Sequence, residues 1–134
     1  MILITGALAN GKREFAARQF FDITEGISWS DGERATWEEY MKAQCCFHFP
    51  FFVKRLMKEE PSVKAPDGWE DVLVLELLKL RGRILITDEI GCGIVPADPF
   101  DRAYREMVGR YCCSLADGAE QVWRICCGLG QRIK

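Results

Sequence analysis

Residues 1–21 of the chain read MILITGALANGKREFAARQFF. Met1–Thr5 is a short apolar run rich in β-branched residues, as in a buried strand, and it ends at Gly6. Apolar residues recur at helical spacing over Arg13–Phe21. Between them, GALANGKR (residues 6–13) matches the pattern G-x-x-x-x-G-K of a phosphate-binding loop, which needs a strand before it and a helix after it. The order of strand, glycine loop and helix therefore predicts such a loop.

The predicted loop would hold phosphate through its backbone N–H groups, which glycines allow to point inward, and through the positive end of the following helix. Lys12 would reach the β- and γ-phosphates of a nucleotide as a catalytic residue. Arg13 stands where Ser or Thr would place a hydroxyl on Mg²⁺, and it could contact phosphate or point to solvent. The alternative is a glycine-rich turn with an incidental lysine. The predicted nucleotide-binding residues are Gly6, Ala7, Leu8, Ala9, Asn10, Gly11, Lys12 and Arg13.

The composition is that of an ordinary globular protein. Of the 134 residues, 49% are hydrophobic and 28% are charged, and we expect one nucleotide-binding domain over residues 1–134. The net charge of −2 predicts no broad attraction to nucleic acid or to an anionic membrane. No apolar run reaches the ~18 residues of a membrane span, and the N-terminal apolar run is too short for a signal-peptide core. We therefore expect a cytoplasmic protein.

The chain has seven cysteines, which is many for its length. Six of them form adjacent pairs at 45–46, 112–113 and 126–127, no C-x-x-C occurs, and His48 is the only histidine. Zinc sites usually draw on spaced Cys and His ligands, so this pattern favours no zinc site. We expect most of these cysteines to be reduced, buried, small apolar residues.

The rest of the chain alternates between predicted helices and strands. In order, these are a helix opened by a capping box at 36–39, a helix from Pro50 to about Lys58, a helix over 69–82, a strand over 83–87, a long helix from Asp98 or Pro99 to 117–118, a strand over 121–127 and a short tail. Dense Val and Leu leave a strand at 72–77 as an alternative, and the turn-rich residues 22–35 carry no assigned element. Strands separated by helices predict an α/β fold with a mostly parallel sheet flanked by helices.

Three further groups of side chains are candidates for chemistry. Asp88 and Glu89 follow a buried strand, where a carboxylate can organise Mg²⁺, and Glu89 is also a catalytic candidate; the alternative is a plain loop before a helix capped by Asp98. His48 could act as a nucleophile or general base, or could be a packed, hydrogen-bonded histidine in the apolar segment CCFHFPFF. The basic residues Lys54, Arg55 and Lys58 are expected on a solvated helix face rather than on an anionic ligand.

The last third of the chain resembles a known family. EIGCGIVP (89–96), YREMVGR (104–110), AEQVW (119–123) and GLGQRIK (128–134) are similar to segments of the adenosylcobinamide kinase/adenosylcobinamide-phosphate guanylyltransferase family. These segments are E-[VI]-G-x-G-I-V-P, F-R-x-x-x-G-R, A-x-x-V-[WY] and G-[IL]-x-x-x-[IL]-K. The opening ILITGALANGK is similar to the family's I-L-V-T-G-G-x-x-S-G-K-S.

The resemblance implies a P-loop NTPase-like fold and a role in cobalamin biosynthesis, with GTP or ATP and Mg²⁺. One family activity phosphorylates the aminopropanol hydroxyl of adenosylcobinamide, the other transfers GMP to that phosphate through a histidine, and members assemble as trimers. The resemblance assigns Gly6, Gly11 and Lys12 to phosphate and places Glu89 near the nucleotide. The chain is shortened before Asp88 and lacks the family's histidine segment, so that role is not carried onto His48. A divergent member that binds nucleotide or corrinoid without turnover is the alternative.

Overall fold

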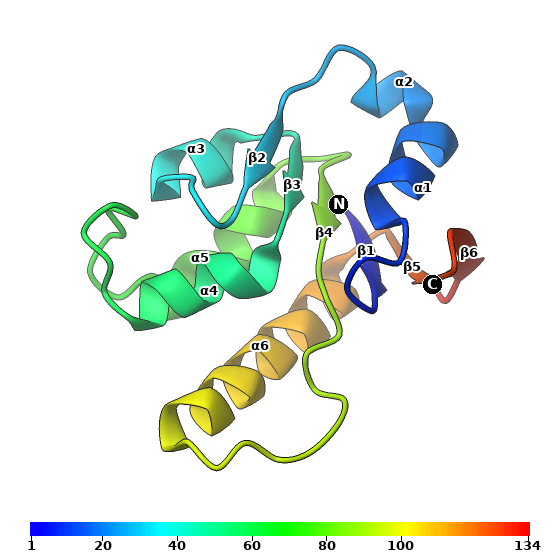
Figure 1. The fold of residues 1–134 in the computed structure, drawn as a ribbon. Coiled ribbons are helices and arrows are strands. Elements are labelled where there is room, and N and C mark those ends of the chain that lie inside the picture. Colours follow the sequence, from blue (N-terminus) through cyan, green and yellow to red (C-terminus); the bar gives the residue numbers. More distant parts are fainter.

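The computed structural model describes residues 1–134, and a six-stranded sheet forms its centre (Figure 1). The strands are β1 (Ile2–Gly6), β2 (Trp29–Asp31), β3 (Cys45–Phe47), β4 (Ile84–Ile86), β5 (Gln121–Cys126) and β6 (Leu129–Arg132). Their order across the sheet is β2-β3-β4-β1-β5-β6, and every neighbouring pair is parallel except β5 with β6. The predicted α/β fold with a mostly parallel sheet is confirmed.

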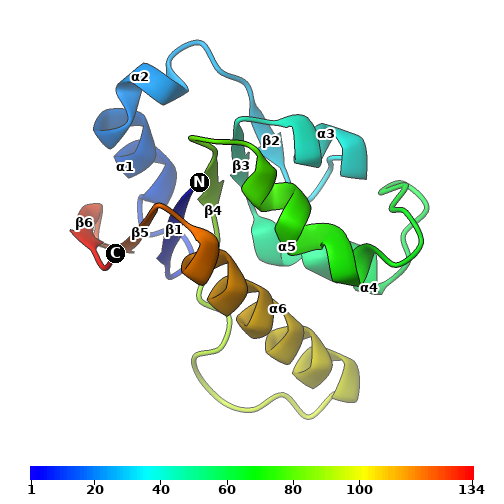
Figure 2. The ribbon, with the colours of Figure 1, turned by 180° about the vertical axis from the view of Figure 1, so that it is seen from behind.

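Helices cover both faces of this sheet (Figures 1 and 2). They are α1 (Lys12–Gln19), α2 (Phe21–Thr24), α3 (Trp37–Lys42), α4 (Phe49–Met57), α5 (Trp69–Lys79) and α6 (Pro99–Gly118). Side chains alternate between the faces of a strand. Accordingly, Ile2 and Ile4 belong to the smaller core under α1, whereas Leu3 belongs to the larger core under α3 to α6. No helix is long and apolar enough to cross a membrane.

The predicted helix boundaries agree with local chemistry. Thr36 and Glu39 form the expected capping box, and Asp98 accepts a hydrogen bond from the backbone N–H of Asp101 at 3.0 Å to cap α6. The alternative strand at 72–77 is wrong. That segment lies in α5, whose residues Trp69, Leu73 and Leu77 recur every four positions and are buried on one side of the helix.

Four short elements were not predicted. The short helix α2 and the strand β2 lie almost entirely in the segment 22–35, to which no element was assigned. The strand β3 lies just before the helix predicted from Pro50, and β6 lies in the predicted C-terminal tail. β2 and β3 are three residues long each, which is too short to show the alternation that identifies a strand. β6 is exposed along its whole length and pairs antiparallel with β5, so its position depends on the neighbouring strand rather than on hydrophobicity.

Two arginines are buried in the fold. Arg83 is fully buried and donates to the carbonyls of Ala43 and Met41 at the end of α3 and of Leu77 in the last turns of α5. Arg55 was expected on a solvated face, and this was wrong. It is 8% exposed and donates to the carbonyls of Gly32 at 3.0 Å and Ala35 at 2.8 Å, because the 32–35 loop needs donors for its buried carbonyls.

The cysteines are all free, but most of them are not buried. Cys45 and Cys46 are buried in β3, between β2 and β4, Cys112 is half-buried, and the remaining four are exposed. The expectation of mostly buried cysteines was therefore wrong, because position 92 falls on a loop, 113 on the outer face of α6, and 126–127 at the end of β5 and in the turn after it.

This distribution predicts a thiol-labelling pattern. Burial raises the pKa of the Cys45 thiol to about 11 and of the Cys46 thiol to about 12, so at pH 8 both are protonated and shielded. A chromogenic disulfide reagent should react quickly with four thiols, and with the others only after denaturant is added. More than four fast thiols in the folded protein would contradict the placement of β3 in the core.

Candidate functional site

The candidate site lies where parallel strands end at the same edge of the sheet. From β1 the chain runs to β2 at one edge of the sheet. From β4 it crosses β1 and reaches β5 on the opposite side, so the order of the strands reverses at β1. Ligands of open α/β sheets bind at the carboxyl ends of strands at such a switch point. The segments after β1, β3 and β4 meet there, which brings together residues 6–13, His48 and Asp88.

The loop after β1 has the backbone form that its glycines predict. Gly6 has a φ of +153°, and a Cβ at this position would lie 2.5 Å from the carbonyl oxygen of Ile125. Only glycine therefore lets β1 pass so close to β5 and enter the loop. α1 begins at Lys12, so its first N–H groups and its positive end face the loop.

Asn10 ties the loop to the turn between β5 and β6. Its side-chain amide donates to the carbonyl of Ile125 at 3.1 Å, and its Oδ1 accepts from the backbone N–H of Cys127 at 3.1 Å. Its own carbonyl accepts from the N–H of Gly128 at 3.0 Å. The sequence motif predicts Asn10 as a nucleotide-binding residue. In the structure, Asn10 also fixes the loop to the end of β5 and the turn after it.

Lys12 forms a buried ion pair with Asp88. Its Nζ lies 2.6 Å from Asp88 Oδ1, and the two side chains are 7% and 9% exposed. Nζ also donates to the carbonyls of Gly6 at 3.1 Å and Ala7 at 2.5 Å. The lysine is thus held in one place by three acceptors, and its role toward phosphate stays a prediction.

A pocket of about 180 Å³ opens beside this pair, and we call it the loop pocket. It is lined by residues 8–14, by Phe47 and His48 after β3, and by Ile86 and Asp88 at the end of β4. The structure therefore brings together Lys12, Asp88 and His48 from three segments far apart in sequence. Glu89 does not line the loop pocket, and lies instead in a neighbouring hollow with Ala7 and Asn10.

The two predicted Mg²⁺ ligands are already paired with basic side chains. Asp88 is paired with Lys12, and Glu89 accepts from Arg124 at 3.0 and 3.3 Å. Position 13 offers no hydroxyl, because it is an arginine. Asp88 and Glu89 as metal ligands stay a prediction, and the arrangement does not show an open magnesium site at this place.

Arg13 is exposed, in line with one of the two alternatives considered from the sequence, and its contact with phosphate stays a prediction. Its guanidinium carbon lies 4.4 Å from the centre of the Phe47 ring and 5.8 Å from that of Trp29, which is a cation–π arrangement. The side chain therefore packs over β2 and β3 at the margin of the loop pocket, without any hydrogen bond to an acidic group.

We expect Arg13→Ser to change the metal dependence of nucleotide binding. The variant should lose about 0.5–1 kcal/mol of stability with the cation–π contact and should bind ATP with a stronger dependence on Mg²⁺, because it restores the hydroxyl of the motif. Calorimetric titration of ATP at several Mg²⁺ concentrations measures this. Arg18→Ser on the same helix is the control, and an identical Mg²⁺ dependence in wild type and Arg13→Ser would contradict the expectation.

His48 is both hydrogen-bonded and on the wall of the loop pocket. Its Nδ1 lies 2.9 Å from Asp31 Oδ1, and its ring lies between Phe47 and Phe51 at centroid distances of 4.5 and 5.5 Å. It is one-third exposed. A catalytic role stays a prediction; the packed, hydrogen-bonded arrangement is what the structure displays. The partner Asp31 was missed, since only the Asp-Gly turn signal marked it.

Comparison with known proteins identifies the family. The family model "Cobinamide kinase / cobinamide phosphate guanyltransferase" matches residues 51–133. The chain is 41% identical over 95 residues to the "Bifunctional adenosylcobalamin biosynthesis protein CobU" of Escherichia coli strain K12, which covers 61% of this chain and 52% of that protein. It is also 41% identical over 51 residues to the protein of the same name in Salmonella typhimurium, covering 38% and 28% respectively.

The matched regions span about half or less of these relatives. The family model, however, covers well over half of this chain, and it includes most of α4 together with α5, α6, β4, β5 and β6. The resemblance of the C-terminal segments is thereby confirmed. The chain belongs to the cobinamide kinase / cobinamide phosphate guanyltransferase family.

Proposed function

We propose that the chain binds a nucleoside triphosphate, ATP or GTP, with residues 6–13 and transfers its terminal phosphate to the aminopropanol hydroxyl of adenosylcobinamide. The observation that carries the proposal is the buried Lys12, held by Asp88 and two loop carbonyls at the floor of the loop pocket. The relatives, which are named as bifunctional adenosylcobalamin biosynthesis proteins, support the substrate class.

The residues suit phosphoryl transfer by position and charge. The loop backbone and the first turn of α1 would surround the phosphates with N–H groups, and Lys12 would exchange its carbonyl contacts for phosphate oxygens. The Lys12 charge would stabilise the negative charge on the transferred group. Mg²⁺ enters this proposal only as part of the nucleotide substrate, and no step uses an ion held by Asp88 or Glu89. Nothing in the geometry favours GMP transfer.

The test is an incubation of the purified chain with adenosylcobinamide, Mg²⁺ and γ-labelled ATP or GTP, followed by chromatography. We expect labelled adenosylcobinamide phosphate, and none with the double variant Lys12→Met/Asp88→Asn, which keeps the buried site free of an unpaired charge. Absence of product with both nucleotides would contradict the kinase proposal. Calorimetry on the same sample then shows whether nucleotide is bound without turnover.

A further inference from the structure

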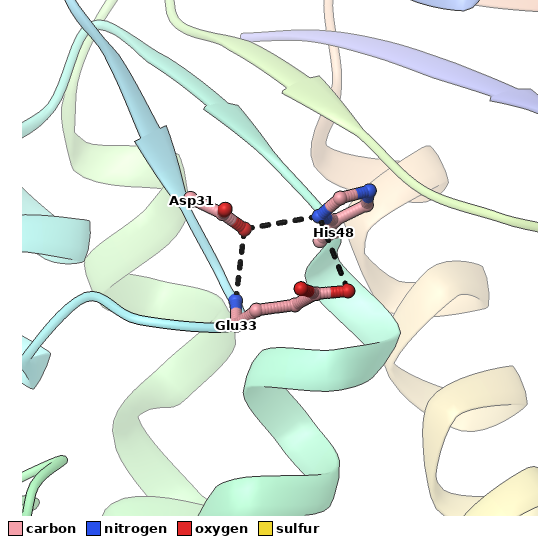
Figure 3. Close-up of side chains that lie close together, drawn as sticks. All are labelled: Asp31, Glu33 and His48. Atoms are coloured by element: carbon pink, nitrogen blue, oxygen red, sulfur yellow. Dashed lines mark hydrogen bonds and ion pairs between the residues drawn. The ribbon is translucent and has the colours of Figure 1, made fainter.

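A second group of side chains lies beside the loop pocket and has no part in the proposed reaction. Asp31 ends β2, Glu33 follows it by two residues, and His48 follows β3 (Figure 3). One donor atom from each of these side chains lies within 4.8 Å of the other two. We call these residues the carboxylate–histidine cluster.

The fold builds this cluster at two neighbouring strand ends. β2 and β3 pair in register with Asp31 opposite Phe47. Gly32 lies between the two acids, and a Cβ there would lie 2.2 Å from the carbonyl oxygen of His48, so only glycine allows this close approach. The carbonyl of Gly32 is in turn held by the buried Arg55 at 3.0 Å. The two acids are therefore placed against His48 by contacts on the backbone between them.

No direct ion pair with a lysine or arginine neutralises Asp31 or Glu33, although the charge of Arg34 acts on Asp31. Asp88 is paired with Lys12, Glu89 with Arg124 and Asp101 with Lys54, but no lysine or arginine forms an ion pair with Asp31 or Glu33. Two acidic side chains thus stand beside His48 without an ion-paired lysine or arginine.

The donor atoms have the spacing of metal ligands. Nδ1 of His48 lies 2.9 Å from Asp31 Oδ1 and 3.7 Å from Glu33 Oε1. Donor atoms bound to one ion at about 2.1 Å are themselves about 3–4 Å apart, so one ion could contact all three after small side-chain movements. The side chains are 26%, 43% and 31% exposed, so an ion can reach them and water can complete its coordination.

We propose that Asp31, Glu33 and His48 form a binding site for a divalent transition-metal ion such as Mn²⁺. One imidazole nitrogen with two carboxylates suits a first-row transition metal better than Mg²⁺, which prefers oxygen ligands alone. Figure 3 shows the second ring nitrogen of His48 on the side away from both carboxylates. The bound ring would carry its proton on that nitrogen, Nε2, and Nδ1 would face the ion. Since His48 also lines the loop pocket, the ion would lie next to that pocket.

The single histidine makes the test direct. We would titrate the full chain with MnCl₂ and follow the ring-proton NMR signals of His48, which are the only imidazole signals in the chain. Mn²⁺ broadens signals of protons next to it, and it binds thiolates weakly, so the free cysteines do not compete. We expect selective broadening that saturates with one ion per chain, with the affinity measured from the electron paramagnetic resonance signal of free Mn²⁺.

Matched variants locate the ion. Asp31→Asn and Glu33→Gln should each weaken Mn²⁺ binding at least tenfold, whereas Glu89→Gln, which removes a carboxylate at the neighbouring hollow, and Asp67→Asn, on a distant loop, should not. Circular dichroism checks folding, and the half-exposed Glu33 gives a variant that leaves the core intact. No broadening at millimolar Mn²⁺, or an equal loss with Glu89→Gln, would overturn the proposal. Nucleotide titration without Mn²⁺ tests the loop pocket separately, so one proposal can fail without the other.

Discussion

Replacing Lys12 with methionine is expected to abolish most nucleotide binding and, at the same time, to destabilise the fold. The side chain contributes a charge-assisted contact to phosphate worth about 1.5–3 kcal/mol, so the affinity for ATP should fall at least about tenfold. In the free protein, methionine would leave the buried carboxylate of Asp88 without its partner. Breaking a buried pair in this way costs about 3–5 kcal/mol, and urea unfolding measures that loss.

A second variant separates the two effects. In Lys12→Met/Asp88→Asn the buried charge is removed together with its partner, so much of the free energy of unfolding should return while ATP binding stays weak. Lys79→Met, on the exposed side of α5, is the control for a simple loss of positive charge. Unchanged ATP affinity in both Lys12 variants would show that the loop pocket is not the nucleotide site. Recovery of affinity in the double variant would show that Lys12 acts only through stability.

Replacing Arg83 with methionine is expected to be among the most destabilising single changes in the chain. The guanidinium is fully buried and donates to carbonyls at the ends of α3 and α5, where the last carbonyls of a helix have no partner within the helix. Each buried carbonyl left without a donor costs about 1–3 kcal/mol. A loss of three such bonds should reduce the free energy of unfolding by at least about 3 kcal/mol, measured by urea titration.

The neighbouring arginine provides the control for this prediction. Arg81 is exposed and uses only its backbone carbonyl, so Arg81→Met should change stability by less than about 0.5 kcal/mol. Arg83→Lys keeps the charge but has a single nitrogen at its tip, and should give an intermediate loss. Equal stability of Arg83→Met and Arg81→Met would contradict the role of Arg83 in holding the two helices together.

The centre of the fold could be predicted from the sequence, because there the local and long-range signals agree. Met1–Thr5 and residues 83–87 are short, apolar and β-branched, and they form the neighbouring strands β1 and β4. The cap at Thr36 and the apolar spacing in α5 are also local properties. β2, β3 and β6 could not be predicted, because three-residue or fully exposed strands gain their stability from partners far away in the sequence.

The part of the candidate site whose backbone is fixed by a motif could be predicted from the sequence. The contacts between side chains from different segments could not be predicted. Residues 6–13 and Asp88 follow from the motif and from the strand ends. The pairing of Lys12 with Asp88, of Glu89 with Arg124 and of His48 with Asp31 joins residues between 17 and 76 positions apart. No periodicity in a sequence reports such a contact, so it appears only in the structure.

The anchoring of Asn10 has a consequence for how the protein is made in the cell. β1 lies between β4 and β5, and the loop that follows it is fixed by Ile125, Cys127 and Gly128. A ribosome synthesises the loop first and these three residues more than a hundred positions later. Contacts so distant along the chain form only after both partners are available. The loop therefore gains these contacts only after β5 and the turn after it have left the ribosome, and the proposed nucleotide binding would await the same step.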